Sequence, residues 1–128
     1  MMNSNKKNNK EKGNLGEKIA EEYLKNSGYI IFEKNFRIRG GEIDIICKDK
    51  ECIVFAEVKT RYSTLYGSPG EAVDLHKQHK IAQTAQVYIM KNKLLNCYFR
   101  FDVVEIVLKD NDEVRSINLV KNAFAFSR

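Results

Sequence analysis

Four charged residues stand among the Ile, Val and Phe residues of a segment that has the pattern of two buried strands. The segment 40–61, GGEIDIICKDKECIVFAEVKTR, carries Glu42 and Asp44 in its first half and Glu57 and Lys59 in its second. Burying a charge is unfavourable unless it is paired or bound to a metal ion. These side chains therefore need partners, a bound cation or a role in chemistry.

The two halves of the segment have the pattern of a β-hairpin whose turn lies in KDKE, residues 48–51. Because side chains alternate across a strand, Asp44, Glu57 and Lys59 should share one face unless a bulge changes the parity. A loop at residues 50–51 places Asp44 directly opposite Glu57. A loop at residues 49–50 places it opposite Phe55 and diagonal to Glu57. Facing Cβ atoms are about 5 Å apart and diagonal ones about 7 Å.

Two carboxylates at this separation can share one divalent cation. Two like charges about 4 Å apart repel by about 4 kcal/mol at an effective dielectric constant of about 20, so without a counter-charge one acid would stay protonated. Lys59 offsets part of this repulsion, and an oxygen-bound cation such as Mg²⁺ offsets the rest. Such a site suits phosphodiester hydrolysis, in which the metal activates water and the lysine stabilises developing charge. The alternative is an exposed cross-strand salt bridge.

The order of Asp44 followed by Glu57-x-Lys59 resembles the PD-(D/E)xK, or restriction-endonuclease-like, nuclease superfamily, although Ile43 replaces the proline of that name. The segments GNLGEKIAEEYLKNSGY, NFRIRGGEIDII, FAEVKTR and RFDVVEI together resemble the YraN-like family of bacterial proteins. This resemblance implies a nuclease fold, a Mg²⁺ or Mn²⁺ site and binding to DNA. It implies that Asp44, Glu57 and the Val58 carbonyl hold the metal, and that Lys59 positions the attacking water.

The chain is also similar to archaeal Holliday-junction resolvases, which place a glutamate of their first helix near the metal. The matching residue here is Glu17, which lies beside Leu24 at the edge of an apolar helical stripe. By this analogy Glu17 binds or orients a second ion, and the substrate is a branched recombination or repair intermediate. The alternative role for Glu17 is a capping box with Asn14, in a helix that begins after Gly13.

The net charge of +5 suggests an anionic partner. Residues 1–12 hold four lysines and one acid, a net charge of +3, which leaves +2 for the other 116 residues. We expect residues 1–12 to be a disordered basic tail that adds at most non-specific affinity for nucleic acid. Arg61, Lys77 and Lys80 are candidates for phosphate contacts, with ordinary surface charge as the alternative.

Periodicity and turn residues predict the elements that position these side chains. They are a helix from about residue 14 to 28, a strand at 29–37, the hairpin, a helix from Ser68, Pro69 and Glu71 to about Lys91, and strands at 97–108 and 113–120. This order predicts an α/β (α+β) domain over residues 13–128, a mixed central sheet of about five strands flanked by helices.

Several classes of protein are disfavoured. No window is apolar over the roughly 18 residues that a membrane helix needs, and the polar N-terminal residues do not have the pattern of a secretory signal. We therefore expect a cytoplasmic protein with no membrane contact. The alternatives to a nuclease are a non-catalytic nucleic-acid-binding module and an interaction subunit that keeps the nuclease fold. A homodimer is a further expectation, because small nucleases that cut two strands often pair.

Overall fold

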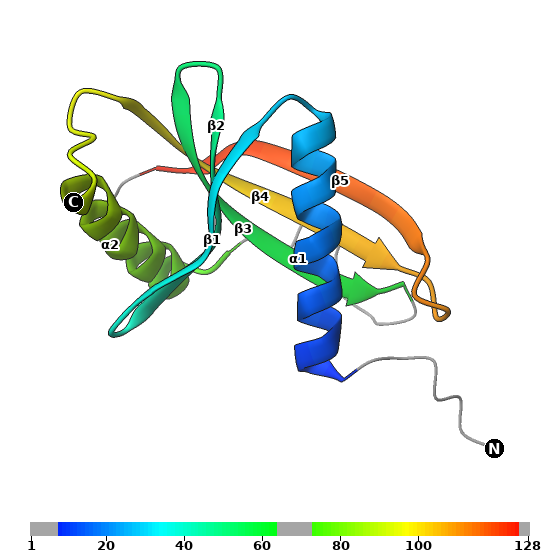
Figure 1. The fold of residues 1–128 in the computed structure, drawn as a ribbon. Helices are drawn as coiled ribbons and strands as arrows, with labels where there is room; N and C mark the ends of the chain where they lie inside the picture. Colours follow the sequence, from blue (N-terminus) through cyan, green and yellow to red (C-terminus); the bar gives the residue numbers. More distant parts are fainter. Residues whose placement is uncertain (1–7, 64–72, 126–128) are drawn as a thin grey trace.

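The computed structural model describes residues 8–63 and 73–125, whose helices and strands follow the predicted order (Figure 1). They are α1 (Asn9–Asn26), β1 (Ile30–Ile38), β2 (Gly41–Asp49), β3 (Cys52–Tyr62), α2 (Leu75–Lys91), β4 (Tyr98–Leu108) and β5 (Val114–Phe124). The predicted α+β class, with a five-stranded mixed sheet flanked by helices, is confirmed and is consistent with a nuclease-like fold.

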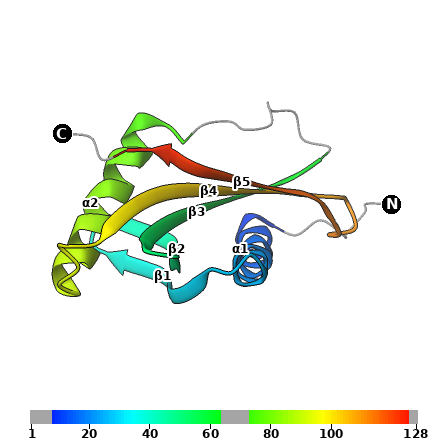
Figure 2. The ribbon, with the colours of Figure 1, turned by 90° about the horizontal axis from the view of Figure 1, so that it is seen from above.

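The sheet has the strand order β1-β2-β3-β4-β5. Its pairs are antiparallel except for β3 and β4, which are parallel and are connected through α2. Figure 2 shows α1 under one end of the long strands and α2 across the other end. Alternation along β3 explains the two layers, because Val54 and Ala56 pack in the core cluster of α1, whereas Ile53 and Phe55 pack in that of α2.

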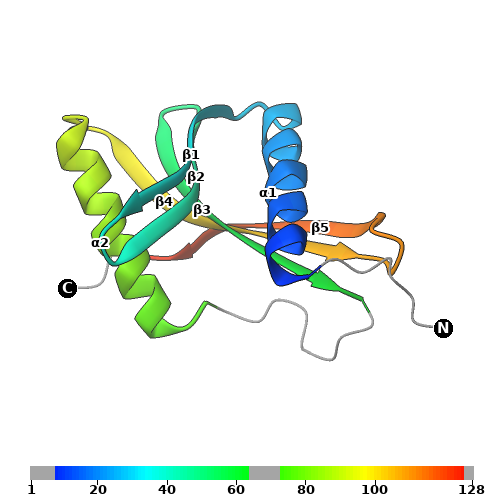
Figure 3. The same cartoon turned by 60° about the horizontal axis from the view of Figure 1, so that its bottom comes forward.

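The register of the β2–β3 hairpin decides between the two predicted loops. Asp49 pairs with Cys52 and Ile45 pairs with Ala56, so the loop is residues 50–51. Continuing this register places Asp44 opposite Glu57, as one of the two alternatives predicted. The pairing itself ends at Ile45, because β2 and β1 then turn away from β3 toward α2 (Figure 3).

Two glycines allow the helices to approach the sheet closely. A Cβ atom on Gly16 of α1 would overlap Oγ1 of Thr60 on β3, and one on Gly41 of β2 would overlap Oγ1 of Thr84 on α2. The first contact fixes α1 against the end of β3 and brings the next residue, Glu17, to the same region. The second holds the start of β2 on α2.

Helix α1 begins earlier than the sequence predicted. Its first residue is Asn9, and the side chain of Asn8 caps it by accepting a hydrogen bond of 2.8 Å from the backbone N–H of Glu11. The prediction that the helix begins after Gly13, with Asn14 as its cap, was wrong. Asn8 already supplies a good cap, and a single glycine within a helix costs only about 1 kcal/mol.

Two predictions change with this boundary. Because Asn14 lies inside the helix, it does not form the capping box that was the alternative role of Glu17. Residues 9–12 belong to α1, so the prediction that they are part of a disordered tail was wrong. Residues 1–7 lie outside the described part of the chain.

Helix α2 begins at Leu75, where the side chain of Asp74 accepts a hydrogen bond of 2.8 Å from the backbone N–H of Lys77. The start predicted at Ser68, Pro69 and Glu71 lies outside the described residues, and the predicted end near residue 91 is confirmed. Neither of the two described helices has the length and apolar composition needed to cross a membrane.

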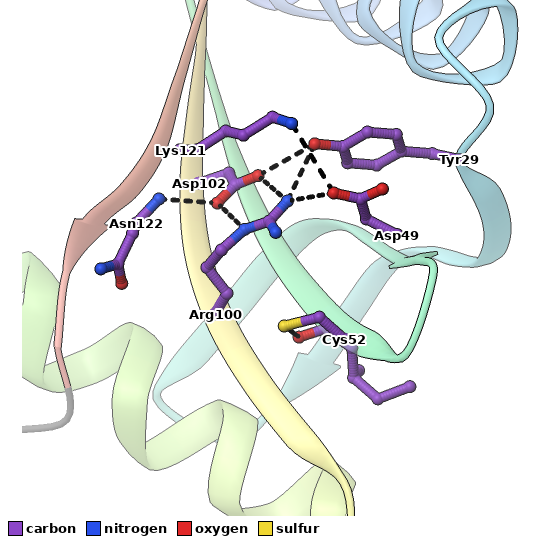
Figure 4. A network of polar contacts seen from close by, with 8 residues as sticks. Tyr29, Asp49, Cys52, Arg100, Asp102, Lys121 and Asn122 are labelled. Carbon is purple, nitrogen blue, oxygen red and sulfur yellow. Dashed lines mark hydrogen bonds and ion pairs between the residues drawn. The ribbon is translucent and has the colours of Figure 1, made fainter.

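A buried polar network fixes the hairpin turn to the rest of the sheet (Figure 4). Arg100 of β4 donates hydrogen bonds to Asp102 at 2.8 Å, to Asp49 at 3.0 Å and to the hydroxyl of Tyr29 at 2.8 Å. Asp102 is 0% exposed and also accepts from the backbone N–H of Asn122 on β5. Buried charges persist when paired in this way, so the network joins the β2–β3 turn to β4 and β5.

Candidate metal site

Asp44 lies where β2 separates from β3, and its carboxylate hydrogen-bonds the backbone of β3 there. Oδ2 of Asp44 accepts a hydrogen bond of 2.8 Å from the backbone N–H of Val58. A backbone N–H in such a position needs an acceptor, and the pairing of β2 with β3 has already ended. The side chain of Asp44 is therefore held against β3 by the fold itself.

Glu57 is the buried member of the site. It is 8% exposed, and its pKa is raised from 4.5 to about 8, first by burial and then by a hydrogen bond with Asp44 and the negative charge of Asp44. At neutral pH Glu57 therefore tends to keep a proton, and its side chain hydrogen-bonds Asp44. This is the state that charge repulsion predicts for two adjacent carboxylates without a cation.

The ammonium of Lys77, on α2, contacts Glu57. Its Nζ lies 3.2 Å from Oε2 of Glu57. The ammonium lowers the pKa of Glu57 but is outweighed by burial and by Asp44. The side chain of Lys77 is 53% exposed, so water screens much of its charge. Lys77, a predicted phosphate contact, lies against Glu57 in the structure.

Glu17 of α1 lies close enough to Asp44 to interact with its charge. Its pKa is raised, first by burial and then by the negative charges of Asp44 and Glu42. Glu42 is exposed and pairs with Arg37, whose Nε lies 2.8 Å from Oε2 of Glu42. The four carboxylates, Glu17, Glu42, Asp44 and Glu57, are called the acidic cluster below. The structure thus brings Glu17 toward Asp44, the position expected from the similarity to the resolvases.

The basic candidates lie on two elements, with Arg61 on β3 and Lys77 and Lys80 on α2. The pairing of β3 with β4 is regular from Glu57 through Arg61, so Glu57, Lys59 and Arg61 share one face of β3. The prediction that Glu57 and Lys59 lie on the same face of the strand is confirmed. Lys80 is exposed on α2, and its backbone carbonyl lies beside Gly41 at the start of β2.

The donor set fits a cation that keeps part of its water shell. Within residues 8–63 and 73–125, no group of three or more His, Cys, Asp or Glu side chains is gathered closely enough to enclose a metal ion. Mg²⁺ commonly uses one or two carboxylates and completes its shell with water and substrate phosphates. Asp44 and Glu57, already in contact, meet that requirement, and a role for the Val58 carbonyl stays a prediction.

Asn35 is a further residue of this region, one that was not predicted from the sequence. It lies in β1 beside the acidic cluster, and its side chain hydrogen-bonds Glu17. A weak signal was present, because asparagine is depleted from strand interiors. This signal did not identify Asn35 as a residue of the site, because only the register of β1 on β2 shows which residue of β2 Asn35 faces.

Comparison with known proteins supplies the family. The sequence pattern described as "Uncharacterised protein family UPF0102" matches residues 16–106, which include the whole acidic cluster. The chain is 59% identical over 117 residues to a UPF0102 protein of Clostridium botulinum (strain Loch Maree / Type A3), and 57% identical over 116 residues to one of Clostridium tetani (strain Massachusetts / E88). Each alignment covers 91% of this chain and 95% of the relative. The chain therefore belongs to the UPF0102 family, the YraN-like proteins that its sequence resembles.

Proposed function

We propose that this protein is a metal-dependent endonuclease that hydrolyses phosphodiester bonds of DNA. The observation that supports it is the contact between Asp44 and Glu57 at the point where β2 leaves β3, with Glu17 within range of the charge of Asp44. Burial and the charge of Asp44 raise the pKa values of Glu57 and Glu17, which costs folding free energy. Groups perturbed in this manner are typical of functional sites.

Bound Mg²⁺ or Mn²⁺ would polarise the scissile phosphate and acidify a water molecule. Asp44 and Glu57 would hold the cation, and the Val58 N–H keeps Asp44 in place. To hold the cation, Glu57 would release its proton, which would cost little near neutral pH because its pKa is about 8. Lys59, on the same face, positions the attacking water and stabilises the charge that develops on the phosphate.

The basic side chains around the cluster would contact the DNA backbone. Lys77, which contacts Glu57 here, would be able to contact a phosphate instead once a cation balanced the charge of Glu57. Arg61 continues the same face of β3, and Lys80 extends the positive charge along α2. A branched recombination or repair intermediate is the substrate that the similarity to junction resolvases favours. A homodimer in the cytoplasm would suit such a substrate.

Cleavage of labelled branched and linear DNA under single-turnover conditions tests the proposal. The parent should cleave with Mn²⁺ and be inactive with chelator, and Asp44→Asn should lose the metal-dependent activity. Asp74→Asn is the matched control, because it makes the same chemical change at a helix cap where Asn serves as well as Asp. DNA binding by the parent without metal-dependent cleavage would favour the non-catalytic binding module instead.

A further inference from the structure

Asn35 occupies an unusual place in strand β1. It stands between the pairs Lys34–Ile45 and Phe36–Ile43, and therefore opposite Asp44. Its φ is +53°, a left-handed conformation in the middle of a strand. Asparagine tolerates this conformation better than most residues, but glycine adopts it without a steric cost. Since Asn35 is exposed, burial of its side chain does not explain why asparagine stands here.

The amide of Asn35 joins two members of the acidic cluster. With the amide oriented so that its nitrogen faces these carboxylates, the nitrogen donates to Oε1 of Glu17 at 2.7 Å and to Oε1 of Glu42 at 3.2 Å. Arg37 contacts the other oxygen of Glu42, Oε2, at 2.8 Å. One neutral side chain therefore connects α1 to β2 and holds the two carboxylates beside Asp44.

We propose that Asn35 is a positioning residue, which holds Glu17 toward Asp44 so that the acidic cluster can receive a divalent cation. The inference rests on the proposed function for the identity of that cation. A neutral donor suits this task, because it orients a carboxylate without supplying a positive charge that would compete with the metal. A lysine or arginine in its place would compete in that way.

The first test removes the amide and keeps the backbone. Asn35→Gly retains the left-handed conformation, so it should melt in chelator close to the parent. Its dissociation constant for Mn²⁺, measured by calorimetric titration, should rise by about tenfold or more, the usual effect of losing a residue that orients metal ligands. Asn122→Gly is the control, because Asn122 has the same φ of 53° but lies on β5 and contacts Asp102 through its backbone.

The outcomes of this titration separate the two proposals. Unchanged Mn²⁺ affinity in Asn35→Gly, beside a parent that binds Mn²⁺, would overturn the positioning role and leave the proposed function intact. A parent that binds no Mn²⁺ would overturn the proposed function, and the metal-positioning role of Asn35 with it. If Asn122→Gly weakened Mn²⁺ binding equally, the effect would come from the strained backbone and not from the lost amide of Asn35. That result would overturn the inference.

The second test needs no metal and examines the bridge itself. Asn35→Asp replaces the donor by a carboxylate facing Glu17 and Glu42, so the melting temperature in chelator should fall. Adding Glu17→Gln should restore most of the loss, because the new amide donates back to the new acid. Adding Glu22→Gln, which removes the same charge from the exposed face of α1, should restore little. Equal restoration by both partners would show a general charge effect and overturn the bridge.

Discussion

Raising the pH should destabilise the metal-free protein, and Glu57 should account for much of the change. In the folded state the pKa of Glu57 is raised from 4.5 to about 8, mainly by burial and by its contact with Asp44. Between these two values the folded protein holds a proton that the unfolded chain has released. The free energy of unfolding therefore falls as the pH rises, and the fall levels off above the folded pKa.

The size of the effect follows from the same two values. Each tenfold drop in proton concentration between them costs about 1.4 kcal/mol, and the curve flattens as the folded pKa is approached. From about pH 6 to pH 9, Glu57 alone should lower the free energy of unfolding by about 2.5 kcal/mol. Glu57→Gln removes the proton exchange and keeps a side chain that can still hydrogen-bond Asp44. The variant should lack this part of the pH dependence.

Urea unfolding in chelator across that pH range measures the difference between the parent and Glu57→Gln. Glu21→Gln is the control, because hydrogen bonds from Lys34 and Lys25 lower the pKa of Glu21. A group with a lowered pKa contributes stability that is complete above its unfolded value and is lost only as the pH falls further, so this control should run parallel to the parent. Parallel curves for the parent and Glu57→Gln would refute the reasoning.

Three other substitutions test the catalytic lysine, the helix packing and the buried ion pair. Lys59→Ala should slow single-turnover cleavage by about 10²–10³-fold with an unchanged circular dichroism spectrum, and an unchanged rate would exclude the catalytic role. Gly16→Ala should lower the free energy of unfolding by about 1–3 kcal/mol, since its methyl group overlaps Thr60, and Thr60→Ala should recover part of the loss. Asp102→Asn should cost about 3 kcal/mol in urea unfolding, because it leaves Arg100 without its closest charged partner, and a loss near zero would contradict that pairing.

Local rules predicted the part of the site that lies on a regular strand. Alternation placed Glu57 and Lys59 on one face, and the β3–β4 register is regular there. The same rules did not decide which residues form the hairpin loop, because two-residue loops at 49–50 and at 50–51 both fit KDKE. The structure has the second, with Lys50 at φ +57°, and no residue type in this turn signals a left-handed conformation strongly enough to predict it.

The helix starts show how tertiary packing overrides a local signal. Gly13 was interpreted as lying before the helix because Asn14 and Glu17 have the spacing of a capping box. Yet α1 runs through it from the Asn8 cap, and the burial of Ala20 and Leu24 on the sheet outweighs the cost of one glycine. Asn35 was missed for a different reason. Its position opposite Asp44 depends on the register of β1 on β2, which shifts between Ile31 and Glu33. This register depends on contacts between distant residues and could not be predicted from local sequence.

The location of a bound cation tests the central claim most directly. Crystals grown with Mn²⁺ and measured at the manganese absorption edge give an anomalous difference map that identifies the ion independently of water. We expect one peak at about 2.1–2.2 Å from a carboxylate oxygen of Asp44 and one of Glu57, with the ammonium of Lys77 moved away from Glu57. Full density for the acidic cluster with no peak between Asp44 and Glu57, and with Lys77 still on Glu57, would contradict the account.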